Sequence, residues 1–460
     1  MDRHRLKPAP FVASSATPPA PPATPDAAAG GGQAPGPAAP QAWRVWRLAH
    51  PVWLCAFRPF FAFAALSAVG LMAAWAAFLW LGWPLPGVPG GPFAWHAHEL
   101  LLGFGLAAVA GFALTAVPEF TETPAFPAAA VRWLALLWLL GRAAFWASGA
   151  WPRPALALAA ACHLALLGGL LALLAPRLWR DPQRRHLSFL WAIVLLALTA
   201  AGFYADAWRG QPATRWLHAM LGVLMALIVV AMSRISMRVV NASIEEHEAR
   251  LSSSADDASE AARYLARPPR RHLAVICITL FTAAQWLQPG GHVSAWLALA
   301  SACAMLNLMG DWHVGRALWR RWPLMLYTVY ACMAAGYALT GAALLGGAIH
   351  ANAGLHLLTT GALGLGIYGV ICIAGYTHSG LDKDGRAWAP LGAALLAASA
   401  VLRAAAYAHA PHLLMPAAAL LWCAAFALMG AYMLPVFLRP RTDGGAGCDG
   451  VLPPPTQNGA

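Results

Sequence analysis

The chain alternates long apolar runs with short polar connections. An apolar run of about 20 residues is long enough for an α-helix to cross the hydrocarbon core of a bilayer. A helix is also the only open-chain element that satisfies its own backbone in lipid. Twelve such runs follow one another, near residues 56–80, 97–118, 131–150, 153–175, 187–206, 213–235, 270–288, 292–310, 323–345, 349–376, 388–408 and 412–437.

This pattern predicts an all-α polytopic integral membrane protein, with about twelve transmembrane helices within residues 46–438. Composition supports the same class. Of the 460 residues, 60% are hydrophobic and 10% are charged, whereas soluble domains carry about 25% charged residues. A soluble globular enzyme and a wholly disordered chain are therefore both excluded.

Three polar segments lie outside the apolar runs. Residues 1–45 are rich in Ala, Pro and Gly, and such a stretch buries too little apolar surface to order itself. We expect a disordered cytoplasmic tail there and a second disordered tail at 439–460. The one long polar connection, at about 236–269, is predicted to be a cytoplasmic loop whose mixed charges suit a short surface helix.

The formal net charge of +12 raises the question of nucleic acid. Most of the 30 Lys and Arg residues lie before the first run, in every second loop and after the last run. This asymmetry is the positive-inside pattern of membrane proteins. It predicts that both termini are cytoplasmic, and that the partner of the basic residues is the lipid bilayer and not nucleic acid.

Sixteen histidines are many for so apolar a chain, and two of them open the second run in Trp95-His96-Ala97-His98-Glu99. Neutral imidazole is a good ligand for haem iron and for copper. Helical residues two apart point to nearly opposite faces, so His96 and His98 are not expected to bind one metal together. Glu99 can orient a histidine or relay a proton. The alternative is an interfacial belt of Trp and His.

His218 and His356 lie early in the sixth and tenth runs, at a depth similar to that of His98. Three helices could thus direct imidazoles to one level, as a metal or haem site in a helix bundle requires. The alternative is a set of separate, internally hydrogen-bonded histidines. His378 lies roughly 33 Å beyond His356 along a helix, so it belongs either to a second, inner site or to a loop.

Two arginines, Arg142 and Arg403, fall inside apolar runs toward the outer side. A buried guanidinium needs an anion. For Arg142 we expect pairing with Glu99 or an extension to the surface. For Arg403, a haem propionate is an equal alternative, because arginine binds carboxylates through two parallel hydrogen bonds.

Three stretches carry a resemblance to a known family: 57–61 (FRPFF), 95–118 (WHAHELLLGFGLAAVAGFALTAVP) and 355–380 (LHLLTTGALGLGIYGVICIAGYTHSG). With them, residues 45–435 resemble the NnrS family in order and length. The resemblance implies a polytopic inner-membrane protein of bacteria that contains haem and copper and is tied to nitric oxide and denitrification stress. The family's motif positions are matched here by Arg58, His96, His98, Glu99, His356 and His378.

The leading hypothesis is therefore a metalloprotein of the bacterial inner membrane with haem and copper as cofactors and nitric oxide as a ligand. We expect His98, His218, His356 and Arg403 to bind the cofactor. The metal ligands are expected among His96, His98, His356 and His378, with Glu99 as proton relay or ligand-orienting group. Turnover and the redox partner are left open.

Two rival classes are left open. One is a twelve-helix secondary transporter without haem, although few carboxylates lie in the middle of the runs. The other is a distant relative of haem–copper oxidases and nitric oxide reductases. That class places a H-x-H pair on span ten and a His-His pair on span seven, and this sequence has neither.

Overall fold

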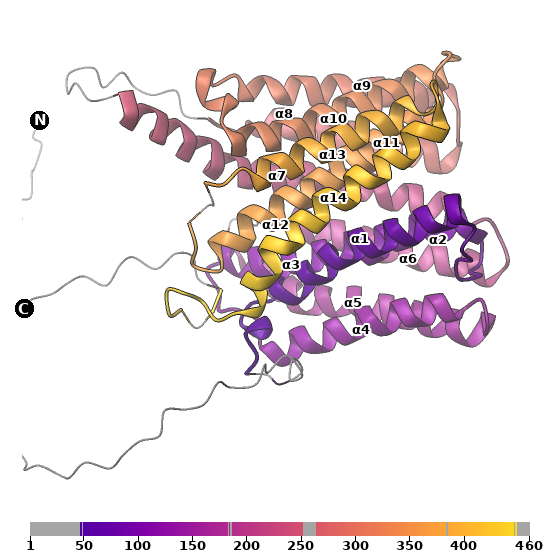
Figure 1. Cartoon of the computed structure of the whole chain (residues 1–460), viewed down its shortest axis with the longest axis horizontal. Coiled ribbons are helices and arrows are strands. Elements are labelled where there is room, and N and C mark those ends of the chain that lie inside the picture. Colours follow the sequence, from indigo (N-terminus) through magenta and orange to yellow (C-terminus); the bar gives the residue numbers. More distant parts are fainter. Residues whose placement is uncertain are drawn as a thin grey trace, which may run out of the picture. The chain divides into compact units, whose positions relative to one another are not determined.

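The apolar runs form helices that lie side by side in one bundle (Figure 1). A computed structural model describes residues 47, 49–182, 184, 186–251, 264–382, 385–445 and 447–448, without the side chains of 247–251. The α-helices are α1 (Phe57–Leu81), α2 (Gly91–His98), α3 (Leu106–Phe120), α4 (Ala128–Ala147), α5 (Pro152–Arg180), α6 (Leu187–Trp208), α7 (Thr214–Leu251), α8 (Pro268–Leu287), α9 (His292–Met309), α10 (Arg321–Leu344), α11 (Ala351–His356), α12 (Leu365–Thr377), α13 (Trp388–Ala405) and α14 (Pro411–Leu438).

Two spans are composite, because a π-helix joins two α-helices end to end. The segment η3 (Glu99–Gly105) connects α2 to α3, and η6 (Leu357–Gly364) connects α11 to α12. Short 3-10 turns also occur at η2 (Pro51–Trp53), η4 (Gly310–Trp312) and η5 (Gly315–Trp319).

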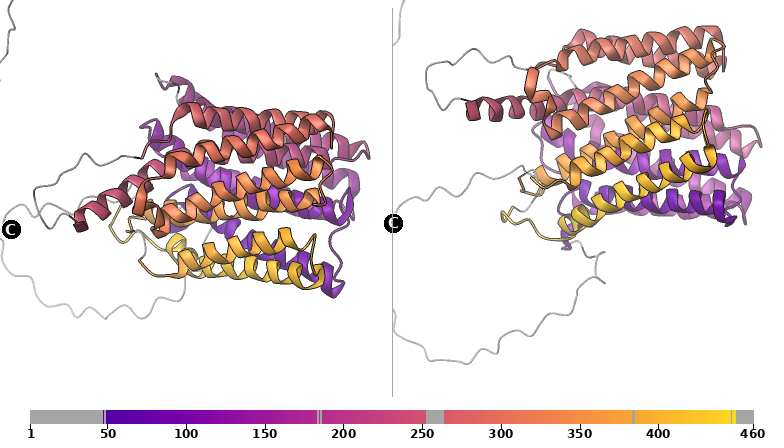
Figure 2. Two further views of the ribbon diagram at one scale, coloured as in Figure 1. Left: turned by 90° about the horizontal axis from the view of Figure 1, so that it is seen from above. Right: turned by 45° about the horizontal axis from the view of Figure 1, so that its top comes forward.

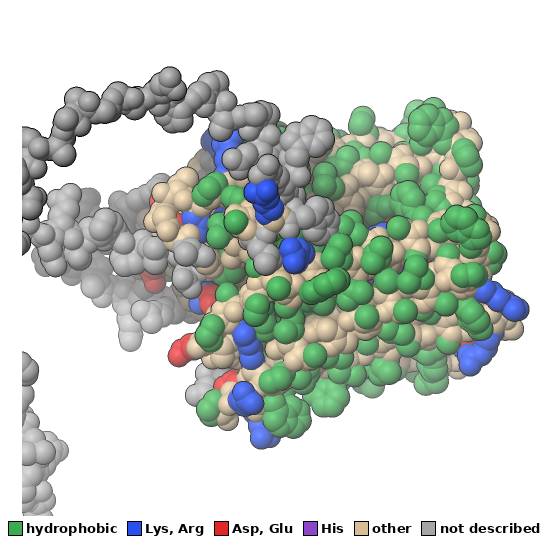
Figure 3. Space-filling view, turned by 90° about the horizontal axis from the view of Figure 1, so that it is seen from below, with side chains coloured by type: hydrophobic (Ala, Val, Ile, Leu, Met, Phe, Trp, Pro, Cys, Tyr) green, Lys and Arg blue, Asp and Glu red, His purple; other side chains and the backbone are tan. Residues whose placement is uncertain are grey.

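The predicted all-α polytopic class is confirmed. Among the described residues, eleven helical spans are long and apolar enough to cross a membrane. The twelfth expected span, α8, is helical but less apolar, and its first turn carries Arg270, Arg271 and His272. Figure 3 shows apolar side chains along the flank of the bundle and Lys and Arg near its ends, as a surface in contact with lipid requires.

The two composite spans form the centre of the bundle. About 89% of the most apolar window of α2–η3–α3 is buried, and 78% for α11–η6–α12, against 28% for α1. The last helix, α14, packs against α1 and α13, so the two ends of the described chain are neighbours. The views in Figure 2 agree with this side-by-side arrangement. These two spans therefore have the most residues in a position to line an internal site.

The boundaries of the polar segments differ from the sequence prediction in two places. Helix α7 continues through the first part of the expected loop to Leu251, since Glu and Arg are good helix formers. Near the C-terminus, Arg441 is buried and donates hydrogen bonds to Asp443 and to the carbonyl of His378, while Cys448 is disulfide-bonded to Cys55. Residues 1–45, 252–263 and 449–460 lie outside the described residues.

Candidate functional site

A cavity of about 600 Å³ opens between α1, the two composite spans, α7, α13 and α14. Four imidazoles line it, from His96, His218, His350 and His356, and we call it the histidine cavity. The rest of its wall is mostly apolar, and no Asp or Glu of the described residues lines it. Its size falls within the range of pockets for small ligands and cofactors.

His96 enters the cavity wall from α2. The chain turns into this helix through Gly90 and Gly91, whose φ angles of 85° and 73° favour glycine. The His96 ring stacks on Trp75 of α1, with ring centroids 4.3 Å apart. Stacking fixes the ring while leaving its nitrogens available for a ligand.

His218 and His356 share one hydrogen-bond arrangement. Nδ1 of His218 lies 3.1 Å from the carbonyl oxygen of Thr214, and Nδ1 of His356 lies 2.8 Å from that of Asn352. Because a carbonyl only accepts, each Nδ1 carries the hydrogen and donates it, and each Nε2 keeps its lone pair. Metal-binding histidines typically have this second hydrogen bond to a carbonyl, which fixes the tautomer.

His218 differs from the other cavity histidines in its surroundings. It also lines a second cavity of about 290 Å³, formed mainly by α7, α8, α10 and α11. His96 and His356 line the histidine cavity but not this second one. They are therefore the more enclosed pair of imidazoles.

Arg403 places a charge at the cavity wall. Its Nη2 donates to the hydroxyl of Tyr407, 2.8 Å away, and the Tyr407 ring stacks on His350. Its Nη1 is buried and has no hydrogen-bond partner among the described residues. A partly buried guanidinium with a spare donor is suited to a carboxylate ligand.

Both π-helices begin directly after a histidine, His98 in one span and His356 in the other. Each π-helix contributes to the cavity wall, η3 through Leu100, Leu101 and Phe104 and η6 through Thr359, Thr360 and Leu363. Such segments are frequent at functional sites. In η6, a Cβ on Gly364 would lie 2.4 Å from the ring of Trp422, so only glycine permits this approach.

The structure places His98 outside the histidine cavity, on the opposite face of α2. Its Nδ1 lies 3.1 Å from Glu99 Oε1 and its Nε2 lies 2.9 Å from the Tyr204 hydroxyl. The ring stacks on Phe145 at a centroid distance of 3.5 Å and is fully buried. Both nitrogens are therefore engaged by the protein.

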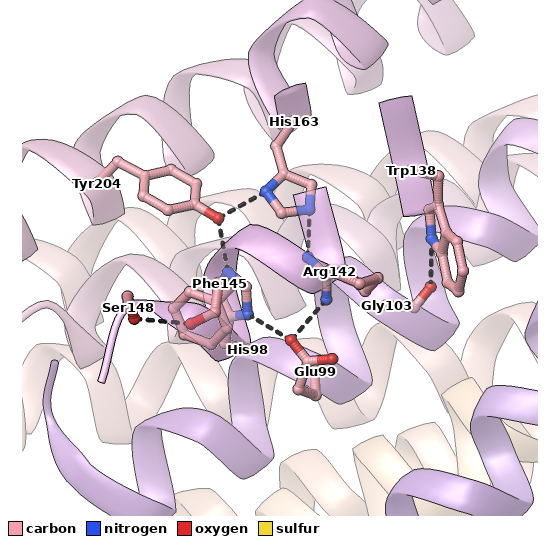
Figure 4. A network of polar contacts seen from close by, with 9 residues as sticks. All are labelled: His98, Glu99, Gly103, Trp138, Arg142, Phe145, Ser148, His163 and Tyr204. Atoms are coloured by element: carbon pink, nitrogen blue, oxygen red, sulfur yellow. Dashed lines mark hydrogen bonds and ion pairs between the residues drawn. The ribbon is translucent and has the colours of Figure 1, made fainter. Parts of the chain in front are cut away.

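Arg142 and His163 complete this second set of contacts (Figure 4). Arg142 Nη1 donates to Glu99 Oε1 at 2.8 Å, so the expected Arg142–Glu99 pair is present. Arg142 Nη2 also donates to His163 Nε2, and His163 Nδ1 lies 2.6 Å from the Tyr204 hydroxyl. We call the five residues His98, Glu99, Arg142, His163 and Tyr204 the buried ring.

His378 lies near the opposite end of the composite span from His356. Its Nδ1 is 2.9 Å from the carbonyl oxygen of Cys448, and its Nε2 is 3.6 Å from Glu119. The structure thus brings together His96, His218, His356 and Arg403 of the expected site residues, but not His98, Glu99 or His378.

Sequence reasoning gave no site role to His350, Tyr407, His163 or Tyr204. A signal existed for Tyr407, which follows Arg403 by four residues and so shares its helical side. Nothing in the sequence marked Tyr204, which meets His98 across 106 residues of chain.

No group of three or more His, Cys, Asp or Glu side chains in the described part of the chain is close enough to hold one metal ion. A site built only from protein ligands is therefore not preformed there. Haem makes a smaller demand, because the porphyrin supplies four ligands and the protein supplies one or two. The imidazoles, the spare Arg403 donor and the cavity size all fit a haem.

Fold and site together define a multi-pass helical membrane protein with a histidine-lined internal cavity. The sequence matches the family described as NnrS protein over residues 51–441, nearly the whole chain, so the chain belongs to the NnrS family. No curated protein matches it significantly.

Proposed function

We propose that this NnrS protein binds haem in the histidine cavity and acts in nitric oxide resistance or a denitrification-linked response in the bacterial inner membrane. The observation that carries the proposal is the tautomer of His356. Its Nδ1 donates to a backbone carbonyl, so its Nε2 has a lone pair at the largely apolar wall of the histidine cavity.

His96 and His356 are the leading candidates to hold the haem iron, and His218 is the third. Arg403, held by Tyr407, would bind a propionate through its unpaired Nη1. Ferrous haem supplies an iron that binds nitric oxide. The largely apolar wall of the cavity would favour a small uncharged ligand at such an iron.

Copper has weaker support than haem. The described residues hold no preformed group of three suitable ligands. His98 and His378, both expected among the metal ligands, have hydrogen-bond or ion-pair partners elsewhere. The proposal therefore centres on haem.

A transporter of small organic anions is the second candidate. Each central span changes from α-helix to π-helix beside the cavity, at η3 or at η6, and π-helices are frequent at functional sites. Arg403 would then bind the substrate carboxylate. This candidate requires no iron.

The test is a reduced-minus-oxidised spectrum of the protein purified in detergent, with its iron and copper content. We expect a Soret band and about one iron per chain, both lost in His356→Ala and retained in the exposed control His292→Ala. A wild-type protein without band or iron would reject the haem proposal and favour the transporter. Full haem in His96→Ala, His218→Ala and His356→Ala would reject the ligand assignment.

A further inference from the structure

The buried ring is a closed circuit of hydrogen bonds between four helical spans (Figure 4). His98 and Glu99 come from the first composite span, Arg142 from α4, His163 from α5 and Tyr204 from α6. All five residues are at most 9% exposed. None of them lines the histidine cavity.

The guanidinium fixes the direction of every hydrogen bond in the ring, because arginine can only donate. His163 Nε2 accepts from Arg142, so His163 carries its proton on Nδ1 and donates it to the Tyr204 oxygen. The Tyr204 hydroxyl then donates to His98 Nε2, and His98 Nδ1–H donates to Glu99. Both histidines are thus neutral, each in one tautomer.

These fixed hydrogen-bond directions suit a structural role of the ring better than a proton path. A proton cannot leave the ring through Arg142, since a guanidinium offers no lone pair. Both nitrogens of each imidazole are held by hydrogen bonds within the ring, which fixes the orientation of each imidazole. The ring therefore holds groups in place.

The ring acts at the point where α2 becomes a π-helix. His98 ends α2 and Glu99 begins η3, while His96 and Leu100 line the cavity. Helix α4 is hydrogen-bonded to this π-helix at two points. Arg142 donates to Glu99, and the Trp138 indole donates to the Gly103 carbonyl at 3.0 Å.

Helices α4, α5 and α6 contribute no residue to the cavity wall, yet they contribute three of the five ring members. The ring is thus the polar connection between these three helices and the span that presents His96. A shift in the ring moves that span, because His96 and His98 lie on one short helix of eight residues.

We infer that the buried ring positions His96 and the η3 wall of the histidine cavity, and that His98, His163 and Tyr204 are positioning residues and not ligands. This inference rests on the proposed function for its haem readout. It predicts that ring variants change how a ligand is held while leaving the ligand-binding side chains present.

The main variant is Tyr204→Phe, which removes the hydroxyl shared by both histidines. Its control is Tyr337→Phe, a buried tyrosine of α10 that lies outside the ring and outside the wall of the histidine cavity, although it lines the second cavity. A second pair of variants, Gly141→Ala and its control Gly168→Ala, disturbs the ring by steric contact and deletes no polar group. A Cβ on Gly141 would lie 2.7 Å from His163 Nε2, whereas one on Gly168 has no neighbouring atom within 4 Å.

We expect Tyr204→Phe and Gly141→Ala to keep haem binding but to shift the Soret spectrum and weaken haem affinity about tenfold, as changes behind a metal ligand do. Tyr337→Phe and Gly168→Ala should match the wild type. An unchanged spectrum and affinity in both ring variants would overturn the inference. Complete loss of iron from folded Tyr204→Phe would also overturn it, since that result is expected for a ligand and not for a positioning residue.

A readout without haem separates this inference from the proposed function. Diethyl pyrocarbonate modifies accessible imidazoles, and mass spectrometry of the haem-free protein reports the modified fraction of His96. We expect this fraction to change in both ring variants and not in their controls. A change without any haem in the wild type would retain the positioning role and reject the haem proposal alone. No change would overturn the positioning role.

Discussion

The two faces of α2 each carry a histidine, and the surroundings of these two histidines are opposite. His96 faces the histidine cavity and stacks on Trp75, and among the described residues its ring has no hydrogen-bond partner. His98 is enclosed, and both of its nitrogens are bonded to protein groups. A histidine is available to a ligand only where its neighbours leave a nitrogen unused. The two histidines of the motif Trp95–Glu99 therefore lie in two different environments and do not form one metal-binding pair.

The two composite spans also differ in the contacts that hold their π-helices in place. The π-helix after His98 is held by charged and polar groups of α4. The π-helix after His356 is held by close packing, in which Gly361 and Gly364 admit Cys332 and Trp422. One side of the cavity is thus positioned by hydrogen bonds and the other by shape.

The largest expected effect separates the two histidines of α2. His96→Ala should remove most of the haem with little loss of stability, because it empties only part of a cavity wall. His98→Ala should keep haem but destabilise the fold by roughly 2–4 kcal/mol, because the buried Tyr204 hydroxyl and the buried Glu99 carboxylate each lose one hydrogen-bond partner. Iron content and thermal unfolding in detergent measure both. The reverse assignment would contradict the comparison.

A second test, of stability alone, concerns the charge of the buried ring. Glu99→Gln leaves Arg142 without its counter-charge, and breaking a buried pair costs about 3–5 kcal/mol. The control is Glu246→Gln, which breaks a surface pair with Arg320 worth about 0–1 kcal/mol. Thermal unfolding of the haem-free proteins compares them. Equal losses in the two variants would show that the ring is not a stabilising charge network.

The smallest effect concerns the carboxylate-binding role of Arg403. Haem should bind wild-type protein about tenfold more tightly than haem dimethyl ester, because one charge-assisted hydrogen bond is lost with the ester. Arg403→Gln should bind both equally. A preference for free haem that survives in Arg403→Gln would place the propionates elsewhere.

Much of the fold follows from the sequence. Lipid offers no hydrogen bonds to the backbone, so each apolar run had to be helical, and the described structure bears this out. The pairing of Arg142 with Glu99 was also predictable, because a buried guanidinium needs an anion and few carboxylates are available. The placement of His96 and His98 on different faces follows from helical geometry.

The sequence did not reveal which face of α2 borders the cavity. Both faces carry a histidine and both are shielded from water, so hydropathy does not separate them. Nor did it reveal the π-helices, because one extra residue in a helical turn leaves no mark in the pattern of apolar positions.

By itself, then, the sequence determined the class of protein, the spans and the stock of histidines and arginines inside them, since these depend on local composition and on the demands of lipid. Only the tertiary structure decided which imidazoles share a cavity and which close a ring. Those contacts join residues such as His98 and Tyr204 that lie on different helices. They depend on how the helices rotate and approach one another, which no single stretch of sequence specifies.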